Sequence, residues 1–168
     1  MATADVYKAR ILSFVEGKDP IEVQRQTPAA LAQLITGIPE SHLYQRPAPA
    51  KWSIAEVLAH LAEAEIVNSW RYRQMVEHTG CPLAPYDQEI WNALGDYSSR
   101  PPSDSLQMFR LLRENNLRVF DRLTPEQWEH YGMHAERGRL TVRELVQLIA
   151  GHDLSHIEQI GKILTRSF

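Results

Sequence analysis

Two histidines four residues apart, His152 and His156, are the side chains of this sequence best suited to chemistry. They stand in a stretch that begins near Thr141, where apolar residues such as Leu145 and Ile149 recur in steps of three and four. Because residues at i and i+4 project from one face of a helix, both imidazoles would replace residues of the core. Burying imidazoles without partners is costly, and a shared transition-metal ion is an efficient way to satisfy two of them. The spacing therefore favours a metal site, with a solvated or purely structural pair as the alternative.

A third ligand must come from another element, and His60 is the best candidate. It lies in a second helical segment, 53 to 78, on the side shared with Val57 and Ala64. Taken alone, an inward-facing histidine is more often a hydrogen-bonded core residue than a metal ligand. The remaining histidines lie in or near polar connections and are expected to be less buried: His42, His78, His130 and His134.

Four long helices must position these residues. Helical patterns cover roughly 20–37, 53–78, 103–122 and 141–165, with short pieces near 5–16, 86–94 and 124–130. Capping boxes are expected where Ser53 precedes Glu56 and where Thr141 precedes Glu144. A further box is expected at Thr124 to Gln127 and an N-cap at Thr27, and no segment shows a strand pattern.

These elements predict an all-α protein, a single domain over residues 1–168 that forms a four-helix bundle with short additional helices. A metal site in such a bundle is built from side chains on facing helices. The predicted positions of His60 and His152 along their helices allow them to meet at one level. Gly151, beside His152, would allow another helix to approach closely.

Composition excludes several classes of protein. The net charge of −3 and the scattered arginines give no basic surface for nucleic acid. No apolar run reaches the ~20 residues of a membrane span, and the first residues are charged, unlike a signal peptide. The single cysteine, Cys81, rules out an internal disulfide framework. We therefore expect a cytoplasmic protein without nucleic-acid or membrane partners.

Two segments carry a family resemblance. Lys51-Trp-Ser-Ile-Ala-Glu-Val-Leu-Ala-His60-Leu and Gly151-His-Asp-Leu-Ser-His156-Ile-Glu-Gln-Ile resemble the DinB-like superfamily of metalloenzymes, as does the turn from Leu123 to Trp128. The resemblance covers essentially the whole domain. It implies an up-and-down four-helix bundle of characteristic topology, often dimeric, in which three histidines hold a divalent metal; here they match His60, His152 and His156. Some relatives use such a site to activate a low-molecular-weight thiol.

Three neutral imidazoles leave at least one coordination position open, as in catalytic sites. The expected function is therefore that of a metal-dependent transferase, isomerase or hydrolase, in which a metal-activated water or thiol attacks an electrophile. The expected cofactor is a divalent ion of zinc, nickel, iron, copper or cobalt, all of which suit imidazole ligands. The expected partners are a small-molecule substrate, a thiol being one option, and a second copy of the chain in a homodimer.

Several roles remain open at this point. Glu63 is a candidate proton acceptor, fourth ligand or outer partner of a ligand, or else a solvated charge. Asp153 could orient a ligand imidazole or form a surface ion pair, and Arg71 is expected in solvent unless it binds an anionic substrate. The His-Asp-x-x-His string differs from zinc peptidases by its shorter carboxylate. The main alternative to an enzyme is a non-catalytic bundle that binds a ligand or partner, with a structural metal or none.

Overall fold

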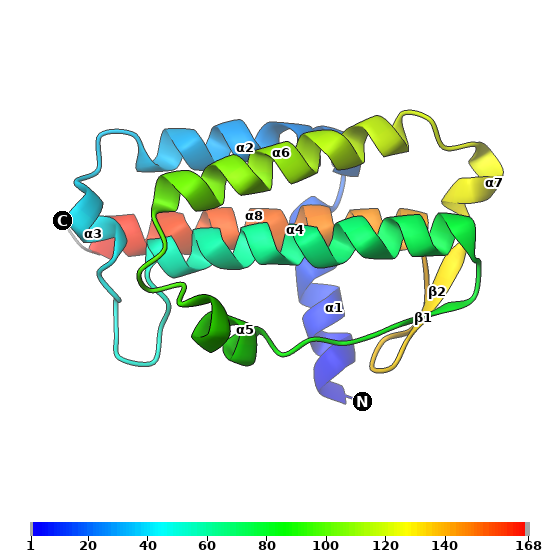
Figure 1. The fold of residues 1–168 in the computed structure, drawn as a ribbon, viewed down its shortest axis with the longest axis horizontal. Helices are drawn as coiled ribbons and strands as arrows, with labels where there is room; N and C mark the ends of the chain where they lie inside the picture. The colour runs from blue at the N-terminus through cyan, green and yellow to red at the C-terminus, as the bar shows by residue number, and fades with distance from the viewer. Residues whose placement is uncertain (1, 167–168) are drawn as a thin grey trace.

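A computed structural model describes residues 2–166 as a bundle of four long helices, α2 (Pro20–Ile35), α4 (Ile54–Glu77), α6 (Pro102–Phe120) and α8 (Val142–Arg166) (Figure 1). Helices α6 and α8 each pack against both α2 and α4, so α2 and α4 occupy opposite corners of the bundle. The expected four-helix bundle is confirmed. Within the described residues, no helix is both long and apolar enough to cross a membrane.

The direction of each helix determines which side chains meet. Helices α2 and α8 run one way, while α4 and α6 run the other (Figure 1). Side-chain contacts agree, since Glu65 of α4 meets Arg113 of α6, and Ser69 one turn later meets Asn116. The long connection between α4 and α6 makes this possible, because it returns the chain to the end where α4 began.

Local hydrogen bonds explain where the helices start. The capping box at Ser53 and Glu56 is present at the start of α4, and Thr141 and Glu144 exchange the equivalent bonds at the start of α8. The predicted box at Thr124 begins α7 (Pro125–Trp128). The predicted N-cap at Thr27 is wrong, because α2 begins one residue after Asp19, whose carboxylate accepts the first free N–H groups.

The expectation of no strands is also wrong. Three short strands form a sheet at one end of the bundle: β1 (Cys81–Leu83) pairs in parallel with β2 (Tyr131–His134), which pairs antiparallel with β3 (Gly138–Thr141). Strands of three or four residues contain too few alternations to show a period of two. The sheet also requires Gly132, where a Cβ atom would lie 2.5 Å from Cγ of Leu83.

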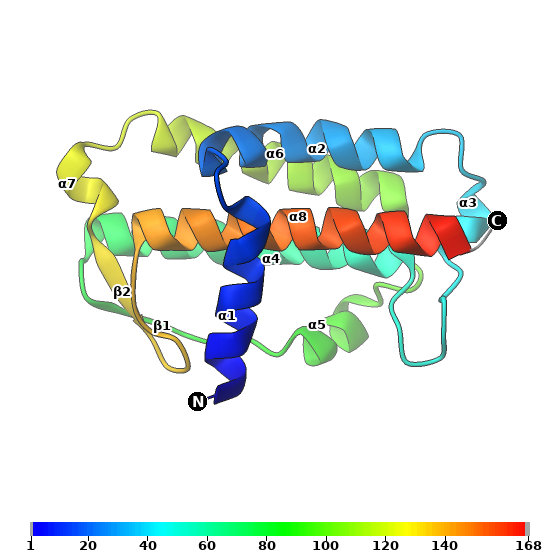
Figure 2. The same cartoon turned by 180° about the vertical axis from the view of Figure 1, so that it is seen from behind.

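Helix α1 (Ala2–Val15) lies across the outer face of α8 (Figure 2). The crossing occurs at Gly151, where a Cβ atom would overlap the backbone carbonyl of Ile11 and lie 2.9 Å from its carbon. The glycine therefore permits the close approach that the sequence predicted. It also brings the side chains of α1 next to His152. The remaining short helices are α3 (Glu40–Leu43) and α5 (Gln88–Gly95).

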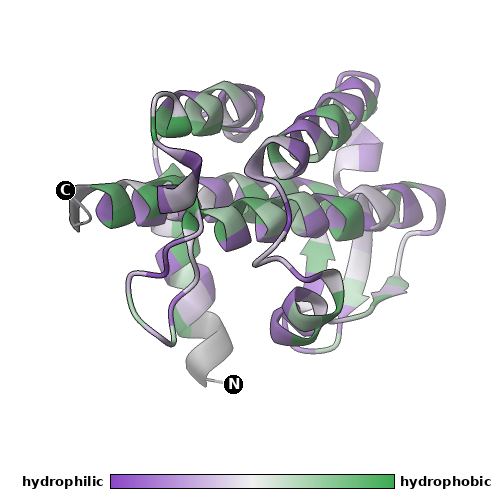
Figure 3. Ribbon diagram, turned by 60° about the vertical axis from the view of Figure 1, so that its left-hand side comes forward, coloured by the Kyte–Doolittle hydropathy of each residue, from purple (hydrophilic) through white to green (hydrophobic). Residues whose placement is uncertain are grey.

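The core has two large apolar clusters, one toward each end of the bundle, with a polar layer between them, and a third, smaller cluster of Ile11, Leu140 and Leu148. Hydrophobic and hydrophilic residues alternate around the bundle helices, as amphipathic packing requires (Figure 3). Arg113, which is fully buried, is the centre of the polar layer: it donates to Glu65, to Asp153 and to the backbone carbonyl of Gln24. These bonds join α6 to the three other bundle helices.

Candidate metal centre

The structure brings the three predicted histidines together between α4 and α8. The Nε2 atom of His152 lies 3.1 Å from Nε2 of His60 and 3.1 Å from Nε2 of His156. One ring nitrogen of each histidine lies within 4.8 Å of those of the other two, and among the side chains of residues 6–165 this is the only such group of histidines, cysteines or carboxylates. Antiparallel packing of α4 and α8 thus places residues 92 positions apart at the same level.

Hydrogen bonds among the three rings cannot satisfy all of their facing nitrogen atoms. Each ring nitrogen carries either a proton or a lone pair, so Nε2 of His152 cannot make a good hydrogen bond to both neighbours at once. The tautomer of His156 follows from one contact: its Nδ1 lies 2.8 Å from Oε1 of Gln159, which can only accept, so Nδ1 carries the proton and donates a hydrogen bond to that oxygen. The Nε2 lone pair of His156 then points at the other two rings. A cation at the centre would accept lone pairs from all three.

The distances fit a metal ion. Two imidazoles bound tetrahedrally at about 2.0–2.1 Å would place their nitrogens about 3.3 Å apart, close to the two separations observed. Burial also keeps the rings neutral, as ligands must be. It lowers the pKa of His60 to about 3, with a further contribution from the nearby His156, and lowers the pKa of His156 to about 4. The pKa of His152 is depressed in the same way, by burial and by the other two rings.

The surroundings of His60 fit a ligand that is held by packing. Its ring is 2% exposed and its Nδ1 atom has no hydrogen-bond partner in the described structure. The indole of Trp52 covers it, with the ring centroids 5.0 Å apart. Trp52 precedes the N-cap Ser53, as the sequence indicated, and the structure gives it this additional position beside the site.

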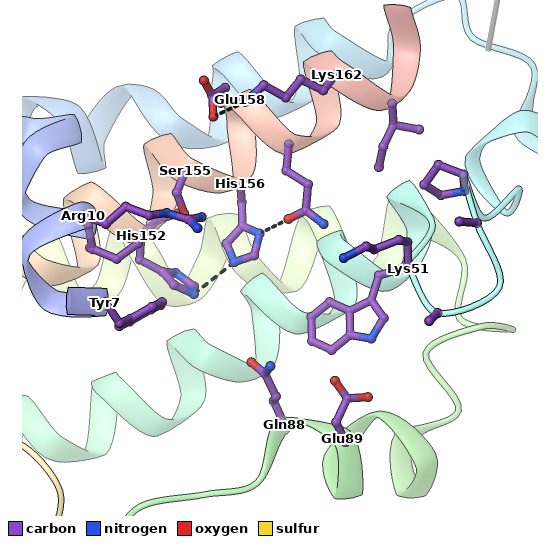
Figure 4. A pocket seen from close by; sticks show the side chains of 17 residues that line it. Tyr7, Arg10, Lys51, Gln88, Glu89, His152, Ser155, His156, Glu158 and Lys162 are labelled. Atoms are coloured by element: carbon purple, nitrogen blue, oxygen red, sulfur yellow. Dashed lines mark hydrogen bonds and ion pairs between the residues drawn. The ribbon is translucent and has the colours of Figure 1, made fainter. Parts of the chain in front are cut away.

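A cavity of about 600 Å³ opens onto the cluster (Figure 4). His152 and His156 lie on its wall, together with Tyr7 and Arg10 of α1 and Lys51 before α4. Its volume falls within the range typical of small-molecule sites. The rings of His152 and His156 are therefore within reach of a ligand from outside the bundle.

The structure separates the other candidates from this cluster. Glu63 is outside the group of three histidines, and its Oε1 accepts a hydrogen bond from Arg100 at 2.8 Å; its part in catalysis stays a prediction. Neither role expected for Asp153 is correct, because it is buried and paired with Arg113. His134 was expected to be less buried than the candidate metal ligands. This expectation is also wrong, since His134 is only 5% exposed.

Sequence comparison agrees with the fold and the site. The sequence model of the DinB superfamily matches residues 25–160, which include all three histidines. The chain belongs to the DinB superfamily. A relative from Bacillus subtilis (strain 168), named "Putative metal-dependent hydrolase YfiT", is 26% identical over 162 residues, covering 95% of this chain and 91% of its own.

Two solved structures share the fold of this DinB superfamily member. The structure of Bacillus subtilis YfiT, described as an unusual four-helix bundle topology, superposes with a TM-score of 0.83, covering 88% of this chain and 85% of its own at 24% identity. A mycothiol-dependent maleylpyruvate isomerase superposes with a TM-score of 0.68 at 10% identity; the match covers 84% of this chain and 59% of that protein.

Sequence reasoning missed several residues around the cluster. From the sequence, Gln159 could be assigned only to the apolar face of the last helix. Its spacing of three residues from His156 is nevertheless one that allows a hydrogen bond to that ring, as the structure shows. The contributions of Tyr7 and Arg10 had no sequence signal, because they depend on how α1 crosses α8.

Proposed function

We propose that this protein is a divalent-metal-dependent enzyme of the hydrolase or thiol-transfer type, with His60, His152 and His156 as the metal ligands. One observation carries the proposal: three neutral imidazoles converge, and two of them, His152 and His156, lie at the wall of an open cavity. The names of its relatives, a metal-dependent hydrolase and a thiol-dependent isomerase, agree with it. When bound, the ion supplies a Lewis acid that lowers the pKa of a water or thiol at its open position.

The residues of the chain hold and shield this position. Oε1 of Gln159 accepts a hydrogen bond from Nδ1–H of His156, which leaves a lone pair on Nε2 of His156 free to bind the ion. Trp52 packs on His60 and limits access of water from that side. Glu63 lies one turn from His60 on α4 and is the candidate proton acceptor, and Arg100 donates a hydrogen bond to its carboxylate.

The metal is tested first. Protein purified without a nickel column is analysed for its metal content, and the variants His152→Ala and His156→Ala are analysed beside it. We expect about one divalent ion per chain in the parent and a loss of affinity of at least about 100-fold in each variant, since even partners of ligands are worth about 10- to 100-fold. Failure of the parent protein to take up any divalent metal would overturn the proposal.

An enzyme is separated from a structural metal site by ligand exchange and turnover. The cobalt-substituted protein should change its visible absorption when azide or a small thiol is added, and His60→Ala should abolish the change. A screen of thiols against electrophilic substrates, and of ester and amide substrates in water, then seeks turnover that requires the metal. A cobalt spectrum that responds to no ligand would favour the non-catalytic bundle.

A further inference from the structure

A second cavity, of about 130 Å³, lies on the side of His60 and His152 that faces the sheet. His152 and Tyr7 line both cavities, so the histidine cluster stands between them. One face of α4 forms a wall of the second cavity through His60, Ala64, Asn68 and Arg71, which follow one another in steps of three and four residues. The small side chain of Ala64 leaves space between the imidazole and the polar residues beyond it.

Arg71 is the most unusual of these side chains. It is only 6% exposed, yet among the described residues no carboxylate lies within ion-pair distance of it. Its one oxygen partner is the backbone carbonyl of Ala84. Buried arginines are ordinarily paired, because an uncompensated buried charge is costly. Arg71 was expected in solvent unless it binds an anion, and its burial corrects that expectation.

A second donor lies beside it. Nδ1 of His134 accepts a hydrogen bond from the backbone N–H of Glu136 at 3.2 Å, so in the neutral ring the proton must be on Nε2. Burial and the nearby arginines lower the pKa of His134, which keeps it neutral. Its Nε2 lies 3.5 Å from Nη2 of Arg71, and both atoms are donors. Two neighbouring donors without an acceptor between them require one, and an oxyanion is the natural choice.

The charges and polar atoms around this pair point the same way. Arg137 lines the cavity and Glu136 is the one carboxylate that does, so the side chains give it a net positive charge even without a metal ion. Oδ1 of Asn68 is buried and has no hydrogen-bond partner in the described structure. It is an acceptor three residues before Arg71 on the same helix, and it fits a hydroxyl or amino group next to the anion.

We infer that Arg71 and His134 form an anion subsite that binds a carboxylate or phosphate of a small substrate, while another part of that substrate reaches the histidine cluster. The further preference is for a hydroxyl or amino group beside the anion, bound by Asn68. That the anion belongs to a substrate depends on the proposed function. Binding of the anion does not, because no donor of the subsite is a metal ligand.

The test uses metal-free protein, in which no ion can bind the probe. Lactate is titrated at pH 7 and followed by NMR chemical shifts, beside propionate, lactamide and inorganic phosphate. We expect saturable binding of lactate that is weakened at least about tenfold by Arg71→Met, which removes charge-assisted bonds, and less by Arg71→Lys. Arg118→Met, an exposed change on α6, should leave binding unchanged.

The outcomes separate the possibilities. Tighter binding of phosphate than of lactate would identify a phosphate subsite, and the reverse a carboxylate subsite. Tighter binding of lactate than of propionate supports the role of Asn68. Equal binding of lactamide and lactate, or the same affinity in the parent and Arg71→Met, overturns the inference.

If Arg71→Met does not fold, Arg137→Gln in the exposed loop serves instead, with a loss of affinity of a few fold expected. Metal uptake measured on the same variants should be normal, so a failed subsite and a failed metal site give different results.

Discussion

The hydrogen bond at the far nitrogen of a ligand imidazole decides which nitrogen can bind a metal. In this protein only one of the three rings has such a bond to a side chain, from Nδ1 of His156 to Gln159. His60 relies on packing against Trp52 instead. Replacement of Gln159 therefore tests the metal site without removing a ligand.

Gln159→Leu should weaken metal binding about 10- to 100-fold, because the proton of His156 is then free to move to Nε2. Gln159→Glu keeps an acceptor and should retain most of the affinity. Competition with a chromophoric chelator measures both. The matched control is Gln147→Leu at an exposed position of the same helix, which should bind as the parent does. Equal affinity in Gln159→Leu and the control would show that the bond has no part in binding.

Some of these residues could be predicted from the sequence and others could not. The pair His152 and His156 is visible because a spacing of four places two side chains on one helix face. His60 could be predicted as the third ligand only from its position on the inner face of its helix together with the family resemblance. Arg71 was wrongly expected in solvent because its neighbours are His134, in an unpredicted strand, and Ala84, in a connection whose position beside α4 no sequence pattern indicated. Burial of one side chain depends on neighbours that are distant in the sequence.

At the scale of elements, helix starts were predictable and contacts between helices were not. The boxes at Ser53 and Thr141 are local, since both partners lie within three residues. The only sequence feature that indicated the crossing of α1 over α8 was the glycine at position 151, and no sequence feature indicated the strands. The crossing matters for function, because α1 supplies Tyr7 and Arg10 to the wall of the larger cavity.

Gly151→Ala should destabilise the protein and displace α1, because the new methyl group would overlap the Ile11 backbone, which cannot move alone. We expect a loss of about 1–3 kcal/mol, as for other overpacked sites. Gly161→Ala on the same helix is the matched control: its Cβ meets nothing within 4 Å. That change should stabilise by up to about 1 kcal/mol through helix propensity. Urea unfolding measures both, and an equal gain in the two variants would disprove the close contact.

The polar layer makes the packing of the bundle helices specific. Arg113 is fully buried and donates to Glu65 and Asp153, so Arg113→Met leaves two buried carboxylates without their cation. Removal of one partner of a buried ion pair costs about 3–5 kcal/mol. Arg118→Met, five residues later on an exposed face of α6, should change the free energy of unfolding by no more than about 0.5 kcal/mol. Similar unfolding curves for the two variants would contradict this role of Arg113.

At the scale of the whole molecule, the buried His60 and His134 and the partly buried His152 and His156 link stability to pH. The pKa values of His60 and His156 fall to about 3 and about 4, and burial also lowers those of His152 and His134. In the unfolded chain a histidine has a pKa of about 6.5. Above that pH neither state is protonated at these sites, so they add no pH dependence. Below it the unfolded chain binds protons that the folded protein excludes, and stability falls until the folded pKa is reached.

The free energy of unfolding of the metal-free protein should therefore fall between about pH 6.5 and pH 4, by about 1.4 kcal/mol per pH unit for each histidine. His152→Leu removes one of them and should make the slope shallower by that amount. His78→Gln is the control, because the His78 side chain is 75% exposed and should leave the slope unchanged. Denaturant unfolding at pH 7, 6 and 5 measures the three slopes. Equal slopes in the parent and His152→Leu would mean that the cluster takes up protons in the folded state and is more open to water than its burial indicates.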